Sequence, residues 1–208
     1  MSLTLAIVTC GPQLEIALSG PSMRAPSVVR LGGATRRSSL LMAAVDLLIE
    51  DGGIDRGELS TVVVSRGPGS FTGIRSGLAT AAGLAAGLGC RVLAYDSLLA
   101  LAARIEGPGE VWAAQPGRRG EVYAQGFVLD QGQAPKASAD LEILRLADLV
   151  VRGPWVAAEA LSLGEARRGA PVRSTAEALI LLAEFGLASQ PIEPLYIEGP
   201  PIHGNGAA

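Results

Sequence analysis

The segment from residue 61 to residue 95 constrains the fold more than any other part of the chain. Thr61–Ser65 is rich in β-branched residues and predicts a buried strand, and Thr72–Leu88 carries a helical pattern that stops before Gly89. A short loop with two glycines and a proline joins them, and a second predicted strand, Arg91–Tyr95, follows the helix. A strand, a helix and a strand in this order predict two parallel strands of one sheet, with the helix packed across them.

The residues before this unit predict three more strands and another helix. Leu3–Val8, Leu14–Leu18 and Val28–Leu31 are short apolar or alternating runs separated by turn residues, a pattern typical of an antiparallel meander. Ser38–Glu50 has apolar residues at helical spacing and ends at a Gly-Gly pair. A meander followed by alternating helices and strands is the outline of a ribonuclease-H-like lobe of the α/β class.

The second half of the chain predicts a partial copy of the same pattern. A helix over Ser97–Ala103 leads to a lobe boundary at Ile105–Gly109. Beyond it we expect strands over Val111–Ala114, Glu121–Val128 and Trp155–Ala158 and an amphipathic helix over Ser174–Gly186. The predicted divisions are residues 1–104 for the first lobe, 105–198 for a shortened second lobe and 199–208 for a disordered tail.

Composition narrows the class of function. The net charge of -3 disfavours a protein that binds nucleic acid by itself, because neutralising phosphates requires a basic surplus. Cys10 and Cys90 are too few for a disulfide framework or a zinc cluster, and His203 is the only histidine. No signal-peptide pattern opens the chain and no apolar run has membrane-spanning length, so we expect a cytoplasmic protein without membrane contact.

The loop between the first parallel strand and its helix is the most unusual local pattern. Gly67 and Gly69 permit backbone angles that other residues resist, and Pro68 stiffens the turn between them. A hydroxyl group of Ser70 or Thr72 can cap the free amides of the helix start, and such a terminus can hold an anion. A well-capped turn without a ligand explains the loop equally, and each nearby arginine could instead form a structural salt bridge. The candidate anion-binding residues are Arg66, Ser70, Thr72, Arg75 and Arg118.

Three established catalytic loops do not fit this segment. A phosphate-binding Walker A loop needs a lysine directly before its serine or threonine, and the only lysine, Lys136, is distant in sequence. The dinucleotide-binding fingerprint needs its third glycine one position before Gly73. A nucleophile elbow around Ser70 lacks glycines at the right spacing, and His203 lies in a tail rich in glycine and proline. The loop by itself therefore predicts neither nucleotide hydrolysis nor acyl transfer.

The same loop resembles a motif of the TsaB (YeaZ) family. Gly67–Arg75 is similar to the family's Gly-Pro-Gly-Ser-Phe-Thr-Gly-Val/Ile-Arg, Arg118–Tyr123 to its Arg-x-Gly-Glu-Val-Tyr hairpin, and Glu193–Ile197 to its Pro-x-Tyr-Leu ending. The resemblance implies an actin-like ATPase fold with a shortened second lobe. It also implies two partners: the catalytic subunit TsaD, which transfers a threonylcarbamoyl group to adenosine next to the tRNA anticodon, and the ATPase TsaE.

Four positions depart from the family pattern. Val8 stands where the family usually has aspartate, Arg37 where histidine is frequent, Pro116 where aspartate is usual, and Glu198 where the ending has arginine. Each change removes a carboxylate, an imidazole or a cation from the cleft in which actin-like ATPases hold metal and phosphate. Valine cannot bind hydrated Mg²⁺, which needs oxygen ligands. The expectation is a subunit with no catalytic residues, no metal and no cofactor of its own.

Two enzyme classes are the alternatives to such a subunit. An actin-like ATPase or phosphotransferase acting alone would place Arg66, Ser70 and Thr72 around a nucleotide, but Val8 removes the acidic residue that such a site needs. A metal-dependent peptidase would need a histidine pair. The leading hypothesis is therefore a non-catalytic subunit that meets tRNA only through its complex with TsaD-like and TsaE-like proteins.

Small residues in the long helix predict where a partner binds. Glycine within a helix costs about 1 kcal/mol relative to alanine, so its repeated use at intervals of four suggests close packing. One row is Gly73, Gly77, Ala81 and Ala85, and a second is Ala79, Gly83 and Gly87. One row can pack on the protein's own sheet, which leaves the other for a partner. The predicted partner-binding residues, for a TsaD-like subunit or a homodimer, are Leu41, Val45, Gly73, Gly77, Ala81 and Ala85.

Overall fold

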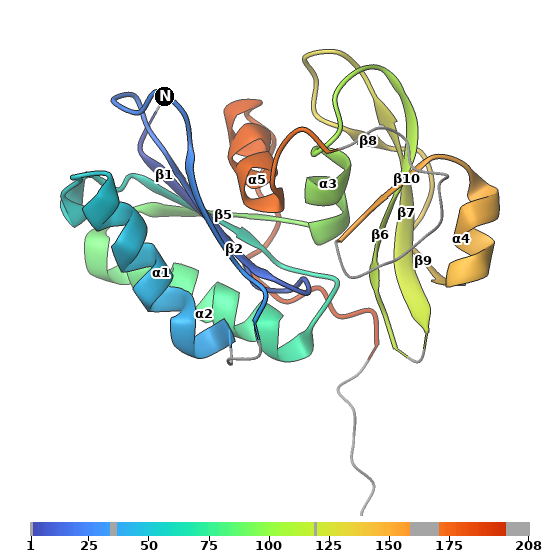
Figure 1. Ribbon diagram of the computed structural model, residues 1–208, viewed down its shortest axis with the longest axis horizontal. Coiled ribbons are helices and arrows are strands. Elements are labelled where there is room, and N and C mark those ends of the chain that lie inside the picture. The colour runs from blue at the N-terminus through green and yellow to red at the C-terminus, as the bar shows by residue number, and fades with distance from the viewer. Residues whose placement is uncertain (1, 34–36, 119, 159–170, 199–208) are drawn as a thin grey trace, which may run out of the picture.

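The computed structural model describes residues 2–33, 37–118, 120–158 and 171–198. Two β-sheets lie side by side, each with its own helices (Figure 1). The sheet of the first lobe has the strand order β3-β2-β1-β4-β5. Its strands are β1 (Thr4–Val8), β2 (Leu14–Ser19), β3 (Ser27–Leu31), β4 (Thr61–Ser65) and β5 (Arg91–Tyr95).

The pairing in this sheet confirms the predicted meander and the predicted parallel unit. β1 pairs with β2 and β2 with β3 in antiparallel register, whereas β1–β4 and β4–β5 are parallel. Every residue of β1 and β4 is buried. Strands covered by helices on both faces are apolar along their whole length, which explains why these two segments do not alternate.

Helices cover both faces of the first sheet. α1 (Arg37–Asp51) and α2 (Phe71–Leu88) lie side by side on one face, and α5 (Thr175–Glu184) lies on the other (Figure 1). A short 3-10 helix, η1 (Arg56–Glu58), leads into β4. Because α5 packs on β1, β2 and β4, the chain returns to the first lobe after forming the second. The predicted division at residue 104 assigns this helix to the second lobe.

The second lobe is a second five-stranded sheet between two helices. β7 pairs with β6, β8 and β9, and β10 runs parallel to β6. α3 (Ser97–Ala102) lies between this sheet and α5, and α4 (Leu146–Arg152) packs on the opposite face (Figure 1). The strands are β6 (Gly109–Pro116), β7 (Glu121–Leu129), β8 (Lys136–Ala137), β9 (Glu142–Arg145) and β10 (Trp155–Ala157). Sequence patterns located β6, β7 and β10 but missed β8, β9 and α4.

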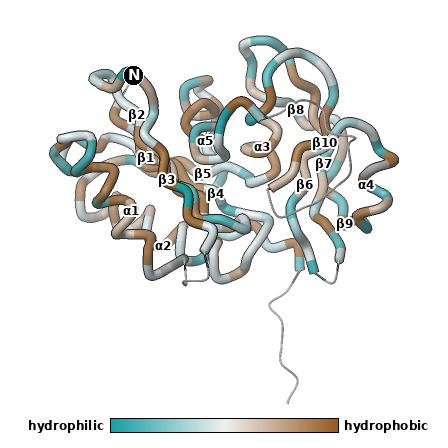
Figure 2. Tube along the Cα trace, viewed as in Figure 1, coloured by the Kyte–Doolittle hydropathy of each residue, from teal (hydrophilic) through white to brown (hydrophobic). Residues whose placement is uncertain are grey.

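Hydrophobic residues follow the strands of both sheets and the inner sides of α1, α2 and α5 (Figure 2). In the first lobe the largest fully buried side chains include Leu5, Ile7 and Ile16, and in the second Trp155 and Leu149. Within the described residues, no helix is both long and apolar enough to cross a membrane. The predicted tail, 199–208, lies outside the residues that the structure describes.

Candidate functional site

The glycine-proline loop after β4 has the backbone angles that its sequence predicts. Gly67 has φ 111° and Gly69 has φ 149°, in the region that favours glycine, and the Gly67–Pro68 peptide bond is cis. A Cβ atom on Gly69 would overlap the side-chain amide of Gln115 and the carbonyl oxygen of Cys10. Glycine at position 69 is therefore required twice, by the backbone angle and by the lack of space.

Gln115, at the end of β6, joins this loop to the second lobe. Its Nε2 donates hydrogen bonds to the carbonyl oxygens of Cys10 and Pro68, each at 2.9 Å, and the residue is 3% exposed. The amide of Ser70 donates to the same Cys10 carbonyl at 2.8 Å. One buried side chain thus holds together the β1–β2 turn, the motif loop and β6. Sequence reasoning missed Gln115, because nothing in its local pattern marks a polar residue with long-range partners.

The start of α2 is capped by Ser70. Its Oγ accepts a hydrogen bond from the amide of Gly73 at 3.3 Å, and its carbonyl accepts one from the amide of Ile74 at 2.8 Å. Of the two hydroxyl groups proposed from the sequence, Ser70 is therefore the cap, and Thr72 is exposed. The helix ends at Leu88 as predicted, with Gly89 left-handed at φ 71°.

The predicted anion-binding arginines lie apart. Arg66 Nε donates to Asp96 Oδ1 at 2.6 Å, and the Arg66 side chain is 14% exposed, so this residue forms the salt bridge that was the alternative to an anion. Arg75 lies over the Phe71 ring, with its guanidinium carbon 5.5 Å from the ring centre. Of the five predicted residues, only Ser70 and Arg118 line the same cavity, which measures about 230 Å³. An anion site in this cavity stays a prediction.

The end of the described chain crosses this cavity from one lobe to the other. The amide of Leu195 donates to the carbonyl of Arg66 at 2.8 Å, and the Tyr196 ring stacks on Phe71 with 4.7 Å between ring centres. Glu198 Oε2 then accepts a hydrogen bond from the Tyr123 hydroxyl at 2.7 Å. We call residues 193–198 the C-terminal strap. It pins the predicted Pro-x-Tyr ending against the motif helix.

The pKa of Tyr123 is raised to about 12, first by burial and then by the hydrogen bond to Glu198 and the negative charge of that carboxylate. Arg118, whose Nε lies 3.7 Å from Glu198 Oε2, opposes this rise. Glu198, which stands where the family has arginine, therefore has a positive neighbour and a phenol donor in this chain. Pro116 lines the same cavity. For the fourth departure, Arg37, the structure describes only the backbone, at the start of α1.

The end of β1 carries no carboxylate. Val8 is 4% exposed, Thr9 Oγ1 donates to the carbonyl of Gly73 at 2.7 Å, and the Cys10 thiol lies 3.0 and 2.9 Å from the hydroxyl oxygens of Ser65 and Ser97. The space at this point between the lobes is about 10 Å³. A volume near that of a single water molecule cannot hold the phosphates of a nucleotide.

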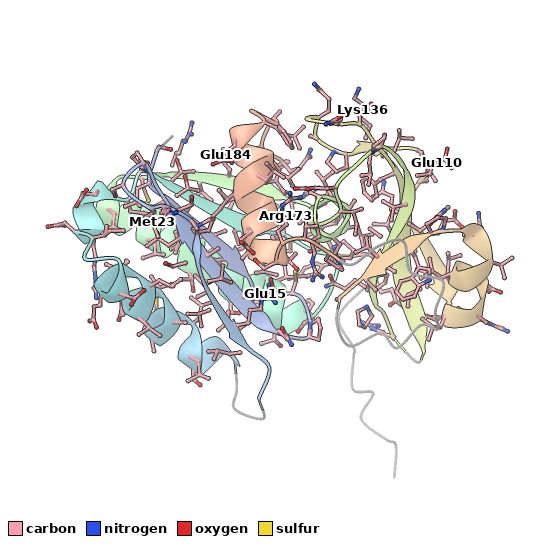
Figure 3. The ribbon with its side chains drawn as sticks, turned by 45° about the horizontal axis from the view of Figure 1, so that its top comes forward. Glu15, Met23, Glu110, Lys136, Arg173 and Glu184 are labelled. Carbon is pink, nitrogen blue, oxygen red and sulfur yellow. The ribbon has the colours of Figure 1, made fainter. Side chains whose placement is uncertain are left out.

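Glu15 is the acidic residue opposite Val8 in the β1–β2 register. Its carboxylate accepts hydrogen bonds from the amides of Thr175 and Ala176, at 2.7 and 3.3 Å, and from the Thr175 hydroxyl at 3.1 Å. The Glu15 carboxylate therefore binds the amides at the start of α5 (Figure 3). Among the described residues, no three histidine, cysteine, aspartate or glutamate side chains group together in a way that could hold a metal ion.

The structure corrects the predicted orientation of the small-residue rows in α2. A Cβ on Gly73 or Gly77 would overlap Thr9, and Ala81 is fully buried, so this row packs on the protein's own sheet. Ala85 is partly exposed. Leu41 and Val45 of α1 are 2% and 0% exposed and lie in the same core. These residues are covered by their own chain, because the closest helix–sheet contact also needs the smallest side chains.

The opposite side of the two helices faces outward. Ala79, Gly83 and Gly87, the second row, are exposed, and a Cβ at Gly83 or Gly87 would meet open space. On α1, Met42 and Leu47 are 43% and 55% exposed. We call this surface the outer helix face. It is the part of α1 and α2 that a partner can reach.

The sequence of this chain is similar to those of proteins of tRNA threonylcarbamoyladenosine biosynthesis. The family model of TsaD, tRNA N6-adenosine threonylcarbamoyltransferase, matches residues 33–163. The TsaB proteins of Escherichia coli and Bacillus subtilis are 30% and 35% identical over 124 and 108 residues, which cover 56% and 51% of this chain. These matches span about half the length of each TsaB protein, 54% and 47%.

Other matches extend along nearly the whole chain. An uncharacterized protein of Mycobacterium tuberculosis is 29% identical over 208 residues, covering 96% of this chain and 93% of the relative. The structure of YeaZ from Pseudomonas aeruginosa superposes with a TM-score of 0.73 and 26% identity, over 95% of this chain and all of the other. With the fold of the YeaZ structure and the capped Gly-Pro-Gly loop at the start of α2, the chain belongs to the TsaB (YeaZ) family.

Proposed function

We propose that this protein is a non-catalytic subunit in the formation of threonylcarbamoyladenosine in tRNA, in the cytoplasm. The observation that carries the proposal is the closed end of β1. Val8 supplies no ligand atom, Glu15 is engaged by α5, and the space between them and the second lobe is about 10 Å³. Family membership gives the pathway, and this closed cleft favours an accessory role over catalysis.

The partners in this proposal are a TsaD-like catalytic subunit and a TsaE-like ATPase, with tRNA held by the complex. The outer helix face supports the contact with the TsaD-like subunit, because it combines exposed Met42 and Leu47 with a row of residues that lack bulk. A flat, partly apolar helix face allows another helix to approach closely. A homodimer would use the same face, so the two assemblies would compete.

The alternative is an actin-like ATPase or phosphotransferase acting alone. The contacts of Arg66 weigh against it, since its guanidinium is paired with Asp96 rather than directed at the cavity beside Ser70. An ATPase would also need an acidic ligand for Mg²⁺, which the end of β1 does not offer.

Reconstitution with a TsaD-like protein from the same source tests the proposal. We expect the chain alone to show no ATP hydrolysis above background, and threonylcarbamoyladenosine formation by the TsaD-like protein to depend on adding it. Ala82→Arg, on the exposed side of α2, should leave the fold intact and weaken the complex by tenfold or more. Turnover of ATP by the repurified chain alone, or full modification activity without it, would refute the accessory role.

A further inference from the structure

The cavity beside the motif loop has one wall that comes from the C-terminal strap. It measures about 230 Å³, and its other walls are residues 68–71 of the loop, residues 116–118 at the end of β6, and Tyr123. Residues 195–198 complete the lining. The strap lies between the two lobes and belongs to neither sheet (Figure 1). It therefore closes the cavity from outside the framework of paired strands.

The chain end that forms this wall is much less buried than the walls opposite it. Every residue from 188 to 198 is exposed or half-buried, whereas Pro68 of the loop and Tyr123 of β7 are buried. A segment with few buried contacts opens locally at a far smaller free-energy cost than unfolding of the whole protein. The strap is therefore the wall of the cavity that opens most readily.

Two contacts attach the strap to the first lobe. The amide of Leu195 donates to the carbonyl of Arg66 at 2.8 Å, and the Tyr196 ring stacks on Phe71 with 4.7 Å between ring centres. Tyr196 is 38% exposed, so much of its ring stays in water and the stack stabilises the closed strap less than a fully buried aromatic pair would. These contacts place the strap over the start of α2 without anchoring it in the core.

A charge-assisted hydrogen bond joins the strap to the second lobe. Glu198 Oε2 accepts it from the Tyr123 hydroxyl at 2.7 Å, and Arg118 Nε lies 3.7 Å from the same oxygen. Hydrogen bonds to an ionised acceptor are about twice as strong as those between neutral groups. Tyr123 is 7% exposed and held in β7, so this donor cannot follow Glu198 away from the sheet. The half-buried Ile197 adds a hydrophobic contact with the same lobe.

We propose that the C-terminal strap is a lid on this cavity and that the hydrogen bond between Glu198 and Tyr123 keeps it closed. In the open state, residues 195–198 leave their places while both sheets stay folded. Opening uncovers the Tyr123 hydroxyl and the Phe71 ring at the start of α2. Because residues 188–198 are exposed or half-buried throughout, this motion leaves the buried residues of both cores in place. All these groups belong to this chain, so the lid does not depend on the proposed partners.

Amide hydrogen exchange of the full chain, followed by NMR under native conditions, tests the lid. The Leu195 amide reports on the strap, because opening breaks its hydrogen bond to Arg66. The Val63 amide, in the middle of the buried strand β4, reports on unfolding of the whole protein. We expect Leu195 to exchange at least about 100-fold faster than Val63, yet more slowly than in an unstructured peptide. If the difference from Val63 is smaller, or if Leu195 exchanges as fast as in a peptide, the proposal is wrong.

Glu198→Gln and Tyr123→Phe change the two sides of the closing hydrogen bond: the first removes the charge of the acceptor, and the second removes the donor. We expect each to speed exchange of the Leu195 amide by about fivefold or more relative to Val63, and the double variant to add little to either. Glu193→Gln is the matched control, because it removes the same charge from an exposed strap residue outside the cavity and should leave the Leu195 rate unchanged. Unchanged exchange in Glu198→Gln and Tyr123→Phe, an equal effect of Glu193→Gln, or fully additive effects in the double variant would overturn the proposed closing contact.

Discussion

The carboxylate of Glu15 accepts a hydrogen bond from the backbone amide of Thr175 at 2.7 Å, although 160 residues separate them in the chain. Glu15 lies on β2, and Thr175 is the first residue of α5. A negative charge at a helix N-terminus satisfies amides that have no partner within the helix and interacts favourably with the helix dipole. This contact fixes the returning helix on the first sheet.

Glu15→Gln tests that relationship. The glutamine can still accept one hydrogen bond, but it loses the charge that strengthens the contacts with Thr175 and Ala176. We expect the free energy of unfolding to fall by about 1–2 kcal/mol in urea denaturation. Glu184→Gln is the control, because it removes the same charge from the exposed C-terminal end of α5 and should change stability by less than about 0.5 kcal/mol. Equal losses in the free energy of unfolding would mean that the buried carboxylate of Glu15 stabilises the protein no more than the exposed one of Glu184.

Gly69, in the loop before α2, and Gly83, within α2, test two different effects of glycine on stability. Gly69 is needed for its positive φ, whereas Gly83 carries only the cost of a glycine inside a helix. Gly69→Ala places a Cβ against Gln115 and the carbonyl of Cys10 at φ 149°, so we expect a loss of about 2 kcal/mol or more. Gly83→Ala, in open space within the helix, should instead stabilise the protein by up to about 1 kcal/mol. Thermal denaturation of both variants checks the pair. A Gly69→Ala protein as stable as Gly83→Ala would show that the loop does not have this conformation.

Local patterns were sufficient for the five strands of the first sheet and for α1 and α2, but not for the return of α5 to that sheet. The β-branched run Thr61–Ser65 and the helical pattern up to Leu88 are set by short-range periodicity and end at glycines, so the strand, the helix and their parallel pairing were predictable. β8 spans only Lys136–Ala137, which is too short to carry a period. β9 and α4 follow each other without a turn residue between Arg145 and Leu146, and no local pattern divides them.

The contacts of the candidate site depend on residues far apart in sequence. The spacing of small residues predicted two rows on α2 but could not show which row packs on the sheet. The prediction that the row with Ala81 faces a partner was wrong, because Ala81 is buried and Ala79 is exposed. Arg66 forms an ion pair with Asp96, which lies thirty residues later in the chain, and no local pattern indicates this pairing. Gln115 was missed for the same reason. The chemistry of each side chain was predictable, but its partner was not.

The pKa of Tyr123, raised to about 12 from an ordinary value of 10.0, predicts a change in stability at high pH. Between pH 10 and about 12 the phenol loses its proton in the unfolded chain but keeps it in the folded protein, so the free energy of unfolding falls as the pH rises through this range. Below pH 10 this group contributes no pH dependence. Glu198→Gln should lower the pKa of Tyr123 without restoring the ordinary value, because burial remains the largest cause.

Spectrophotometric titration of phenolate absorbance follows this group, and Tyr123→Phe identifies its transition among the three tyrosines. In the Glu198→Gln variant the transition assigned to Tyr123 should move to lower pH, and that of Tyr95, whose pKa burial also raises, should stay where it is. A Tyr123 transition at the same pH in both proteins would show that the C-terminal strap does not reach the second lobe in solution.

Neighbouring alanines on α2 test which side of the helix faces the core. Ala81 is fully buried against the first sheet, whereas Ala82 is exposed. Arginine at position 81 would either separate α2 from β4 or bury a charge without a partner, and each outcome costs several kcal/mol. We expect Ala81→Arg to lose about 4 kcal/mol or more and to be largely unfolded at 37 °C, because that loss approaches the whole stability of many domains.

Ala82→Arg makes the same chemical change one residue later, where the side chain can extend into water. It should change the free energy of unfolding by less than about 0.5 kcal/mol. Circular dichroism during thermal unfolding separates the two variants directly. If Ala81→Arg unfolds at the temperature of Ala82→Arg, the first row is not against the sheet, and the outer helix face has been assigned to the wrong side of α2. If Ala82→Arg is the variant that unfolds, the helix is rotated by about one residue, 100°, from its place in the structure.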